Sequence, residues 1–243
     1  ILNGNDGSQF KAMLALFNIP ESALKGNSIG AYQDFQNGKI ESAINYEFSK
    51  ELREKFGKIF RDKPSKDYSK YLPAENLMGV YAAALDLKEV YNVLSSLRMT
   101  KRFDYKLEEM GTSSAEVLGA LSGEGMIGWY RAKGSLESDL LFVSGVGDKA
   151  NIEKLLQATS ALKVVQVNGN RITANLPPDK TIHGAFNDEI LVLSTRAEWV
   201  EPAMNGGFGA QAAKHEAITA IQQGWAGIAI TGFDFLTDLP VFG

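Results

Sequence analysis

The sequence contains no cysteine among its 243 residues and only two histidines. The lack of cysteine excludes disulfide bonds, thiol catalysis and zinc sites with sulfur ligands. No apolar run reaches the length of about 20 residues that a membrane-spanning helix needs. His183 and His215 are isolated, and no HExxH or EF-hand pattern occurs. From these absences we expect no metal site, no cofactor and no transmembrane segment.

Charge of either sign is also not in excess. Lysine and arginine number 25 and aspartate and glutamate 29, which gives a net charge of −4, and both signs are mixed along the chain. Proteins that bind nucleic acid usually carry a basic stripe, because neutralised phosphates supply most of their affinity. We therefore expect no nucleic-acid partner. A hydrophobic content of 44% is typical of a globular protein.

One glycine-rich stretch superficially looks like a phosphate-binding loop. It runs Ser144-Gly145-Val146-Gly147-Asp148-Lys149. A P-loop requires Ser or Thr after the lysine, and a dinucleotide loop requires a third glycine three residues after the second, but Ala150 occupies both places. We interpret the stretch as a strand-to-helix turn in which Asp148 caps the helix.

What the chain does have is internal repetition. The segment from Leu24 to Ile44 matches the segment from Leu121 to Leu140 with two single-residue shifts, so that Tyr32 corresponds to Tyr130. A second, shorter repeat relates residues 78–87 to residues 226–235. Self-similarity of this kind predicts a structure built from duplicated units. It also predicts that the chain is a piece of a longer repetitive protein.

Turn chemistry and residue periodicity indicate the fold class. Four hairpins are expected around residues 36–38, 132–134, 168–169 and 187–188, since Asn-Gly and related pairs favour tight hairpin turns. Ser113 with Glu116, and Thr195 with Glu198, have the spacing of a helix capping box. The sequence therefore predicts an α+β fold: antiparallel β-hairpins and sheets, covered by helices on one face, and built from duplicated hairpin–helix units.

The connector 61–72 is the segment richest in proline and charge, and it falls between two copies of the repeat. The expected organisation is a tail of a first α+β unit over residues 1–72, a complete second unit over 73–224 and the start of a further unit over 225–243. A single continuous domain is the alternative, because the two hairpin copies could join one sheet.

Two stretches carry a resemblance to a known family. They are Leu72 to Val80, followed by Leu85-Asp86-Leu87, and Leu121 to Gly128, followed by a hairpin and Asp148-Lys149-Ala150. They resemble secreted lipoproteins of Bacteroidetes that share a domain of unknown function, number 4836. The resemblance implies export and a place at the cell envelope or outside the cell. The anchor, a lipidated cysteine, would lie in a segment that this cysteine-free chain does not include.

Four aromatic side chains are candidates for ligand binding: Tyr32, Trp129, Tyr130 and Phe208. Exposed aromatic rings on a sheet can stack on sugars or anchor a partner, and the alternative is that they pack beneath the covering helices. No residue is proposed as catalytic. We expect a non-catalytic binding or structural module at the cell envelope, whose partner is a glycan, a peptide or another envelope protein. The alternatives are a carboxylate-dependent hydrolase acting on glycans or peptides, and assembly through unpaired strand edges.

Overall fold

The structure is a computed structural model that describes residues 28–36, 39–47, 50, 54, 57–61, 64–96, 100–131, 138–160, 165–176, 180–209, 214 and 226–230. Within 28–47 and 226–230 the description covers the backbone alone. Two compact units are present, one formed by Ile1–Ile59 with Glu89–Phe103 and the other by Phe60–Lys88 with Asp104–Gly243.

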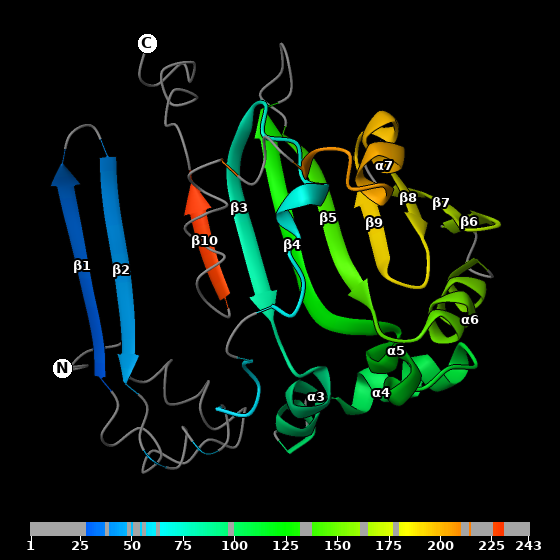
Figure 1. Cartoon of the computed structure of the whole chain (residues 1–243). Helices are drawn as coiled ribbons and strands as arrows, with labels where there is room; N and C mark the ends of the chain where they lie inside the picture. The colour runs from blue at the N-terminus through cyan, green and yellow to red at the C-terminus, as the bar shows by residue number, and fades with distance from the viewer. Residues whose placement is uncertain are drawn as a thin grey trace. The chain divides into compact units, whose positions relative to one another are not determined.

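The second unit contains an eight-stranded sheet in the order β10-β3-β4-β5-β9-β8-β7-β6, and every neighbouring pair is antiparallel (Figure 1). Its strands are β3 (Leu77–Ala84), β4 (Leu121–Arg131), β5 (Ser138–Val146), β6 (Val165–Asn168), β7 (Arg171–Leu176), β8 (Lys180–Phe186), β9 (Ile190–Ser194) and β10 (Ala226–Ile230). The described helices are α3 (Leu87–Ser96), α4 (Lys101–Glu109), α5 (Ser114–Ala120), α6 (Lys149–Ser160) and α7 (Ala197–Met204). The predicted α+β class with antiparallel pairing is confirmed.

The residues in the turns explain the geometry of the two short hairpins. Gly169 has a φ of 60° between β6 and β7, which is the left-handed conformation that this tight turn needs. In the turn before β9, the Asn187 side chain accepts hydrogen bonds from the backbone N–H groups of Glu189 and Ile190. These local bonds set the register of β8 against β9.

The first unit contains the predicted hairpin of β1 (Ser28–Gln36) and β2 (Lys39–Glu47). Tyr32 pairs with Ala43 in this hairpin, and Tyr130 pairs with Asp139 between β4 and β5. These two pairs occupy corresponding positions in the sequence alignment of the repeat. Both tyrosines thus lie on strands of hairpins with matching register, which is what a duplication requires; the duplication itself stays a prediction.

Strands β3 and β10, which contain the two copies of the second repeat, are neighbours in the sheet. Val80 pairs with Ala229 and Gly79 with Ile230. The segment expected to start a further unit therefore supplies a strand to the sheet of the second unit. The turn of the β4–β5 hairpin, expected around residues 132–134, lies outside the described residues.

The main core lies on one side of the sheet, which we call the core face. Alternate residues of β3, β4, β5 and β9 point into it, and α7 covers its β8–β9 end (Figure 1). The buried strand residues of this cluster include Val80, Ala82, Met126, Tyr130, Leu141, Val143, Ile190 and Val192. Val200 and Ala203 of α7 complete this part of the core.

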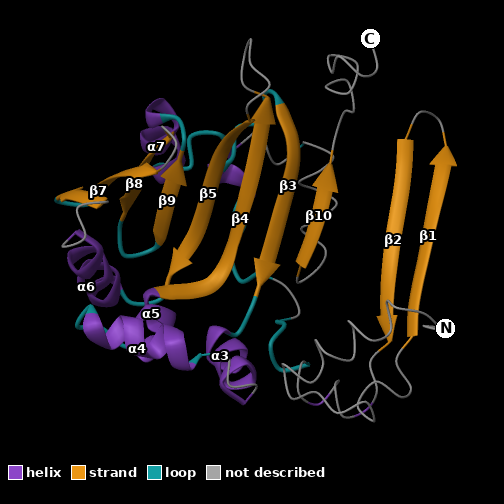
Figure 2. Cartoon of the chain, turned by 180° about the vertical axis from the view of Figure 1, so that it is seen from behind, coloured by secondary structure: helices purple, strands orange, loops and turns teal. Residues whose placement is uncertain are grey.

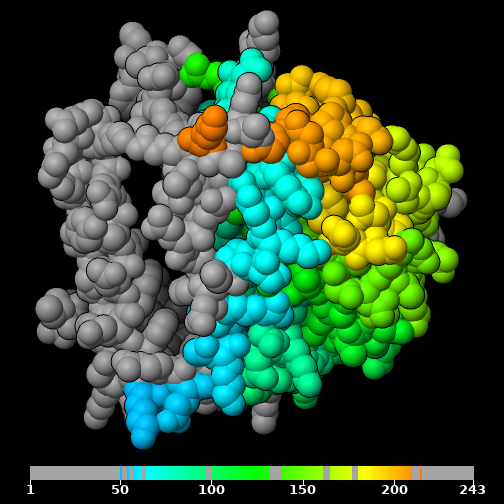
Figure 3. Space-filling view, viewed as in Figure 1, coloured from blue at the N-terminus to red at the C-terminus, as the bar shows by residue number. Residues whose placement is uncertain are grey.

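A segment without long helices or strands covers the rest of the core face; we call residues 64–76 the strap. Tyr68, Tyr71 and Leu72 of the strap are buried against the sheet, and Figure 3 shows the strap and α7 together over this face. The expected unit boundary near residue 72 falls inside this buried segment, whereas the chain passes from one compact unit to the other after Ile59, after Lys88 and after Phe103. The strap is part of the fold because its aromatic and leucine side chains fill the core.

On the opposite face of the sheet, the described helices cover β7, β8 and β9. Ile152 of α6 and Ala120 of α5 pack there with Ile172 and Phe186. Helices therefore cover both faces, each over a different part of the sheet, and the expectation of helices on one face is wrong. Alternate residues of β8 and β9 pack in two separate cores. Ala185 and Val192 lie in the first, while Phe186 and Leu193 pack in the second.

Helix caps decide where two of these helices begin. Ser113 and Glu116 form the predicted capping box of α5, and Asp148 accepts hydrogen bonds from the N–H groups of Ala150 and Asn151 at the start of α6. The capping box expected at Thr195 is wrong, because α7 is preceded by Arg196 as its N-cap. The Thr195 hydroxyl instead accepts from the Leu140 N–H and donates to Asp139, joining β5 to the end of β9.

Candidate functional site

The candidate site is an apolar hollow on the face of β3, β4 and β5 that lies opposite the core face. Its volume is about 160 Å³. Seen from behind in Figure 2, no described helix crosses these three strands. The lining is contributed by β3, the start of α3, β4 and β5: Tyr81, Ala83, Leu87, Leu121, Gly123, Glu124, Gly125, Met126, Ile127, Phe142 and Ser144. Most of these groups are hydrocarbon or aromatic.

Strand register brings the lining together from distant parts of the chain. Tyr81, Ile127 and Phe142 stand side by side on β3, β4 and β5, because Tyr81 pairs with Ile127 and Ile127 with Phe142. Residues directly opposite each other on neighbouring strands place their side chains in contact distance on the same face. The three side chains are half-buried, so a continuous apolar row borders the hollow.

Two glycines leave the floor of the hollow as bare backbone. Gly123 has a φ of +83°, and a Cβ on it would lie 2.1 Å from the carbonyl oxygen of Leu85. A Cβ on Gly125 would lie 2.4 Å from the carbonyl oxygen of Val143. Between Leu121 and Gly125 the register of β4 against β5 shifts, which bends β4. Neither position therefore accepts a side chain, and backbone lines this part of the hollow.

Trp129 extends the same apolar face beyond the hollow. It lies two residues along β4 from Ile127, so it shares that face, and it pairs with Leu140 on β5. The Trp129 side chain is half-buried, while Leu140 is 43% exposed. Of the four aromatic candidates, Trp129 is the one that the structure places beside the hollow.

Tyr130 points into the core face, and the binding role predicted for it is wrong. Its side chain is completely buried, with its ring centroid 4.6 Å from that of Trp199 on α7. Successive residues of a strand point to opposite faces, so Trp129 and Tyr130 cannot serve one surface. Tyr130 packs beneath a covering helix, as the alternative interpretation expected, and burial raises the pKa of its phenol.

Phe208 does not lie beside Trp129, and the prediction for Tyr32 falls outside the described side chains. Phe208 follows α7 and packs, partly buried, against the main core. Tyr32 lies on β1 of the first unit, where its side chain is outside the described part. Trp129, Tyr130 and Phe208 therefore do not form one site, and the role of Tyr32 stays a prediction.

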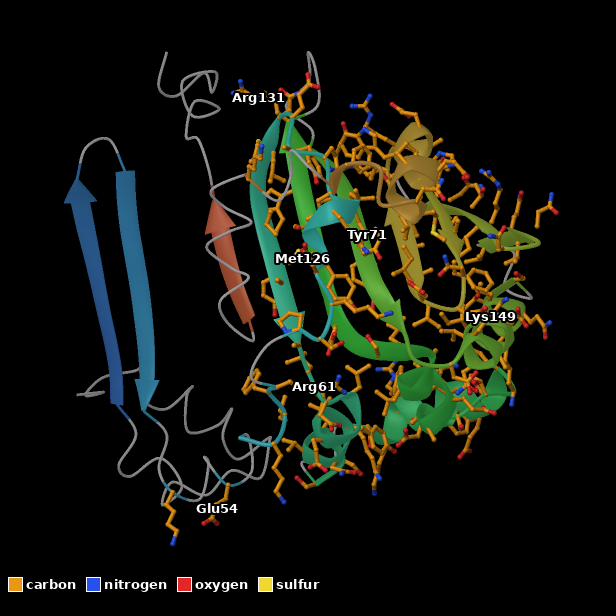
Figure 4. All side chains as sticks on the ribbon, in the orientation of Figure 1. Glu54, Arg61, Tyr71, Met126, Arg131 and Lys149 are labelled. Carbon is orange, nitrogen blue, oxygen red and sulfur yellow. The ribbon has the colours of Figure 1, made fainter. Side chains whose placement is uncertain are left out.

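Glu124 is a buried acid that the sequence analysis did not single out. Its carboxylate accepts hydrogen bonds from Arg61 Nη1 at 3.1 Å and from the N–H and hydroxyl of Ser65 at 2.8 and 2.7 Å. Arg61 lies at the lower end of the sheet in Figure 4. These contacts join β4 to the start of the strap. The Glu124 carboxylate is therefore occupied by structural hydrogen bonds.

The shifted carboxyl groups do not resemble a general acid, whose pKa must be raised. Among the described residues, the carboxyl groups with a shifted pKa are Glu109, Glu116 and Glu198, and all three are lowered. Within the same residues, no group of three or more His, Asp or Glu side chains has the arrangement of a metal site.

The letters GxSxG occur once at Gly26 to Gly30, which the sequence analysis did not note. In hydrolases this pattern places the serine on a sharp turn from a strand into a helix. Here Ser28 is the first residue of strand β1, and the chain continues as a strand to Gln36. The pattern therefore lacks the structural context of a nucleophile.

Comparison with family models, curated proteins and solved structures gives no match for this chain. None of the described helices has both the length and the apolar composition of a membrane-spanning helix.

Proposed function

We propose that this protein is a non-catalytic binding module of the cell envelope, and that the hollow on β3, β4 and β5 receives an apolar side chain of a partner peptide or protein. The hollow is the observation that carries the proposal. The envelope location rests on the resemblance of residues 72–80 and 121–128 to the secreted lipoprotein family.

The size of the hollow favours a single anchor over a whole small molecule. Sites for drug-sized ligands measure about 300–1,000 Å³, whereas this hollow measures about 160 Å³. One large apolar side chain fits such a space, and anchors of this kind supply much of the binding energy of protein interfaces. Trp129 and Leu140 then provide a flat apolar border for the rest of the partner.

The lining chemistry favours a peptide over a glycan. Sugar binding combines aromatic stacking with hydrogen bonds to many hydroxyl groups, so an almost entirely apolar lining suits it poorly. Ser144 is one of the lining residues, but the single proton of its hydroxyl is already taken by the carbonyl oxygens of Glu124 and Gly145, at 3.0 and 3.2 Å. An apolar side chain loses no hydrogen bond on entering the hollow.

Titration with the apolar dye 8-anilinonaphthalene-1-sulfonate tests whether the hollow binds apolar groups. We expect saturable binding by the folded chain and a loss of about tenfold in affinity in Ile127→Glu, since a carboxylate there opposes burial of an apolar ring. Val167→Glu is the matched control, because Val167 is a β-branched residue of β6 that lies outside the hollow. Circular dichroism confirms that both variants keep the fold.

Equal dye affinity in Ile127→Glu and Val167→Glu would contradict the proposal, as would the absence of saturable binding. Arrays of peptides and glycans then distinguish the partner classes. We expect hits among peptides that contain a Phe, Leu or Ile anchor, and these hits should disappear in Ile127→Glu but not in Val167→Glu. Selective capture of glycans would show that the assigned ligand class is wrong.

A further inference from the structure

The turn between β6 and β7 contains an Asn-Gly pair, Asn168-Gly169, that the proposed function does not use. An asparagine followed by glycine is chemically labile, because the backbone nitrogen of the next residue attacks the side-chain amide and glycine has no Cβ to hinder the attack. The described part of the chain contains two such pairs, Asn168-Gly169 and Asn205-Gly206. Their surroundings differ, and the difference predicts which pair reacts.

Asn168 and Gly169 lie at the exposed tip of the β6–β7 hairpin (Figure 1). No described group forms a hydrogen bond with the Asn168 side-chain amide or with the Gly169 N–H. A Cβ built on Gly169 meets no atom within 4 Å, so the space around the turn is open. The backbone of Asn168 is held by its ladder pair with Arg171, which is the last pair of the four-residue strand β6. Strand ends open locally at low cost, and opening this pair lets the amide approach the Gly169 nitrogen.

In the second pair, both reacting groups are already engaged at the end of α7. Asn205 Nδ2 donates a hydrogen bond to the carbonyl oxygen of Glu201 at 3.0 Å. The Gly206 N–H donates to the carbonyl oxygen of Ala203, also at 3.0 Å. Both bonds must break before the nitrogen reaches the amide carbon, and each bond of this kind slows the reaction by up to about tenfold. Asn205 is therefore an internal control with the same pair of residues.

We propose that Asn168 is a site of non-enzymatic modification, at which Gly169 displaces ammonia and water then converts the residue to isoaspartate or aspartate. In the first step, the Gly169 nitrogen forms a bond to Asn168 Cγ, the Cγ–Nδ2 bond breaks, and the proton of the Gly169 nitrogen leaves with Nδ2 as ammonia. In the second step, a water molecule adds to one carbonyl carbon of the cyclic imide and breaks its bond to the ring nitrogen. Opening at Cγ leaves aspartate, and opening at the backbone carbonyl leaves isoaspartate.

Either product changes the contacts of β6. Aspartate at position 168 places a carboxylate opposite Arg171, whose Nη2 donates to Glu201 Oε2 of α7 at 2.8 Å. Isoaspartate adds a methylene group to the backbone, which disturbs the neighbouring pair of Val167 with Ile172. Ile172 is buried in the core on the α6 side of the sheet. The modification therefore loosens this end of the sheet as the molecule ages.

Incubation of the full chain at mildly alkaline pH, followed by peptide mapping with mass spectrometry, tests the proposal. In the folded chain, we expect Asn168 to lose its amide at least about tenfold faster than Asn205, with both isoaspartate and aspartate as products. In the chain unfolded by guanidinium chloride the two rates should be similar, since the hydrogen bonds that protect Asn205 are then absent. Amide hydrogen exchange over residues 171–176 should be faster in the fraction that contains isoaspartate than in fresh protein.

Equal rates at Asn168 and Asn205 in the folded chain would overturn the proposal. Aspartate without isoaspartate at Asn168 would also overturn it, because direct hydrolysis by water gives aspartate alone. If both sites react in the unfolded chain and neither reacts in the folded one, the ladder pair protects Asn168 and the proposal is wrong. None of these measurements depends on the hollow, so failure here leaves the dye and peptide results unaffected.

Discussion

At the scale of single residues, the described part of the molecule contains several buried hydroxyl groups without a hydrogen-bond partner, and that of Tyr130 lies in the main core. The Tyr130 hydroxyl is buried, and no described residue forms a hydrogen bond with it. The ring lies over its own strand, since a Cβ on Gly128 would approach the hydroxyl oxygen to 2.5 Å. A buried hydroxyl without a partner costs about 1–3 kcal/mol relative to one that is satisfied.

We therefore expect Tyr130→Phe to leave the free energy of unfolding unchanged or to raise it by about 1 kcal/mol, since it removes this cost and keeps the ring contact with Trp199. Tyr130→Ala should lower it by about 3–5 kcal/mol through loss of the buried ring. Urea denaturation measures both values. A large destabilisation in Tyr130→Phe would show that the hydroxyl has a partner.

A second prediction at this scale concerns the floor of the hollow. Gly111 and Gly123 have similar positive φ angles, +73° and +83°, but a Cβ on Gly111 meets nothing within 4 Å, whereas one on Gly123 meets the Leu85 carbonyl oxygen. Gly111→Ala should cost about 1–2 kcal/mol, the strain of a left-handed residue alone. Gly123→Ala should cost clearly more, because the backbone must also move. Equal costs in chemical denaturation would contradict the close approach.

At the scale of elements, the strap depends on one buried carboxylate. Glu124 connects Arg61 and Ser65 to β4. Glu124→Gln keeps the size of the side chain but removes its charge, and hydrogen bonds to charged groups contribute about 1.5–3 kcal/mol. We expect a loss of about 1–3 kcal/mol in the free energy of unfolding and faster amide hydrogen exchange over residues 64–76.

Glu189→Gln, at an exposed position, is the control and should change stability by less than about 0.5 kcal/mol. If Glu124→Gln behaves like this control in both measurements, the ion pair does not hold the strap in place.

Helix α5 provides the pH-dependent element. Hydrogen bonds from Lys154 and from Ser113 lower the pKa of Glu116 to about 2. A carboxyl group whose pKa is lower in the folded state stabilises the fold above its unfolded value near 4.5, and this contribution is lost as the pH falls towards 2. Stability should therefore decline across this window, and the decline should be smaller in Glu116→Gln. NMR titration that gives Glu116 an ordinary pKa would contradict this.

At the scale of the whole molecule, short-range patterns predicted the helices and strands, but not which apolar residues lie on which face of the sheet. The hairpin turns and the Ser113 capping box are local, so their residues were sufficient to identify them. Strand β4 is apolar on both faces, with Met126 and Tyr130 towards the core and Ile127 and Trp129 away from it. Sequence alone could not decide which aromatic ring was buried, since the answer depends on where α7 packs.

The strap and the hollow depend on long-range contacts. Residues 61–72 look like a linker because Pro64 and several charges surround Tyr68 and Tyr71, yet these rings are buried beneath the surface of the second unit. The hollow results from the pairing of β3, β4 and β5 and from the bend at Gly123 and Gly125, which no local pattern indicates. Glu124 gives a weak signal in retrospect, as an acid in an otherwise apolar strand.

The central claim, that the hollow receives an apolar anchor, is tested most directly by methyl NMR during titration with N-acetylphenylalaninamide, a neutral minimal peptide anchor. We expect saturable shifts for Leu87, Leu121 and Ile127, which line the hollow, and none for Val192 or Ile152, which lie in the two closed cores. Shifts spread evenly over all five residues, or no shift at Ile127, would contradict the claim.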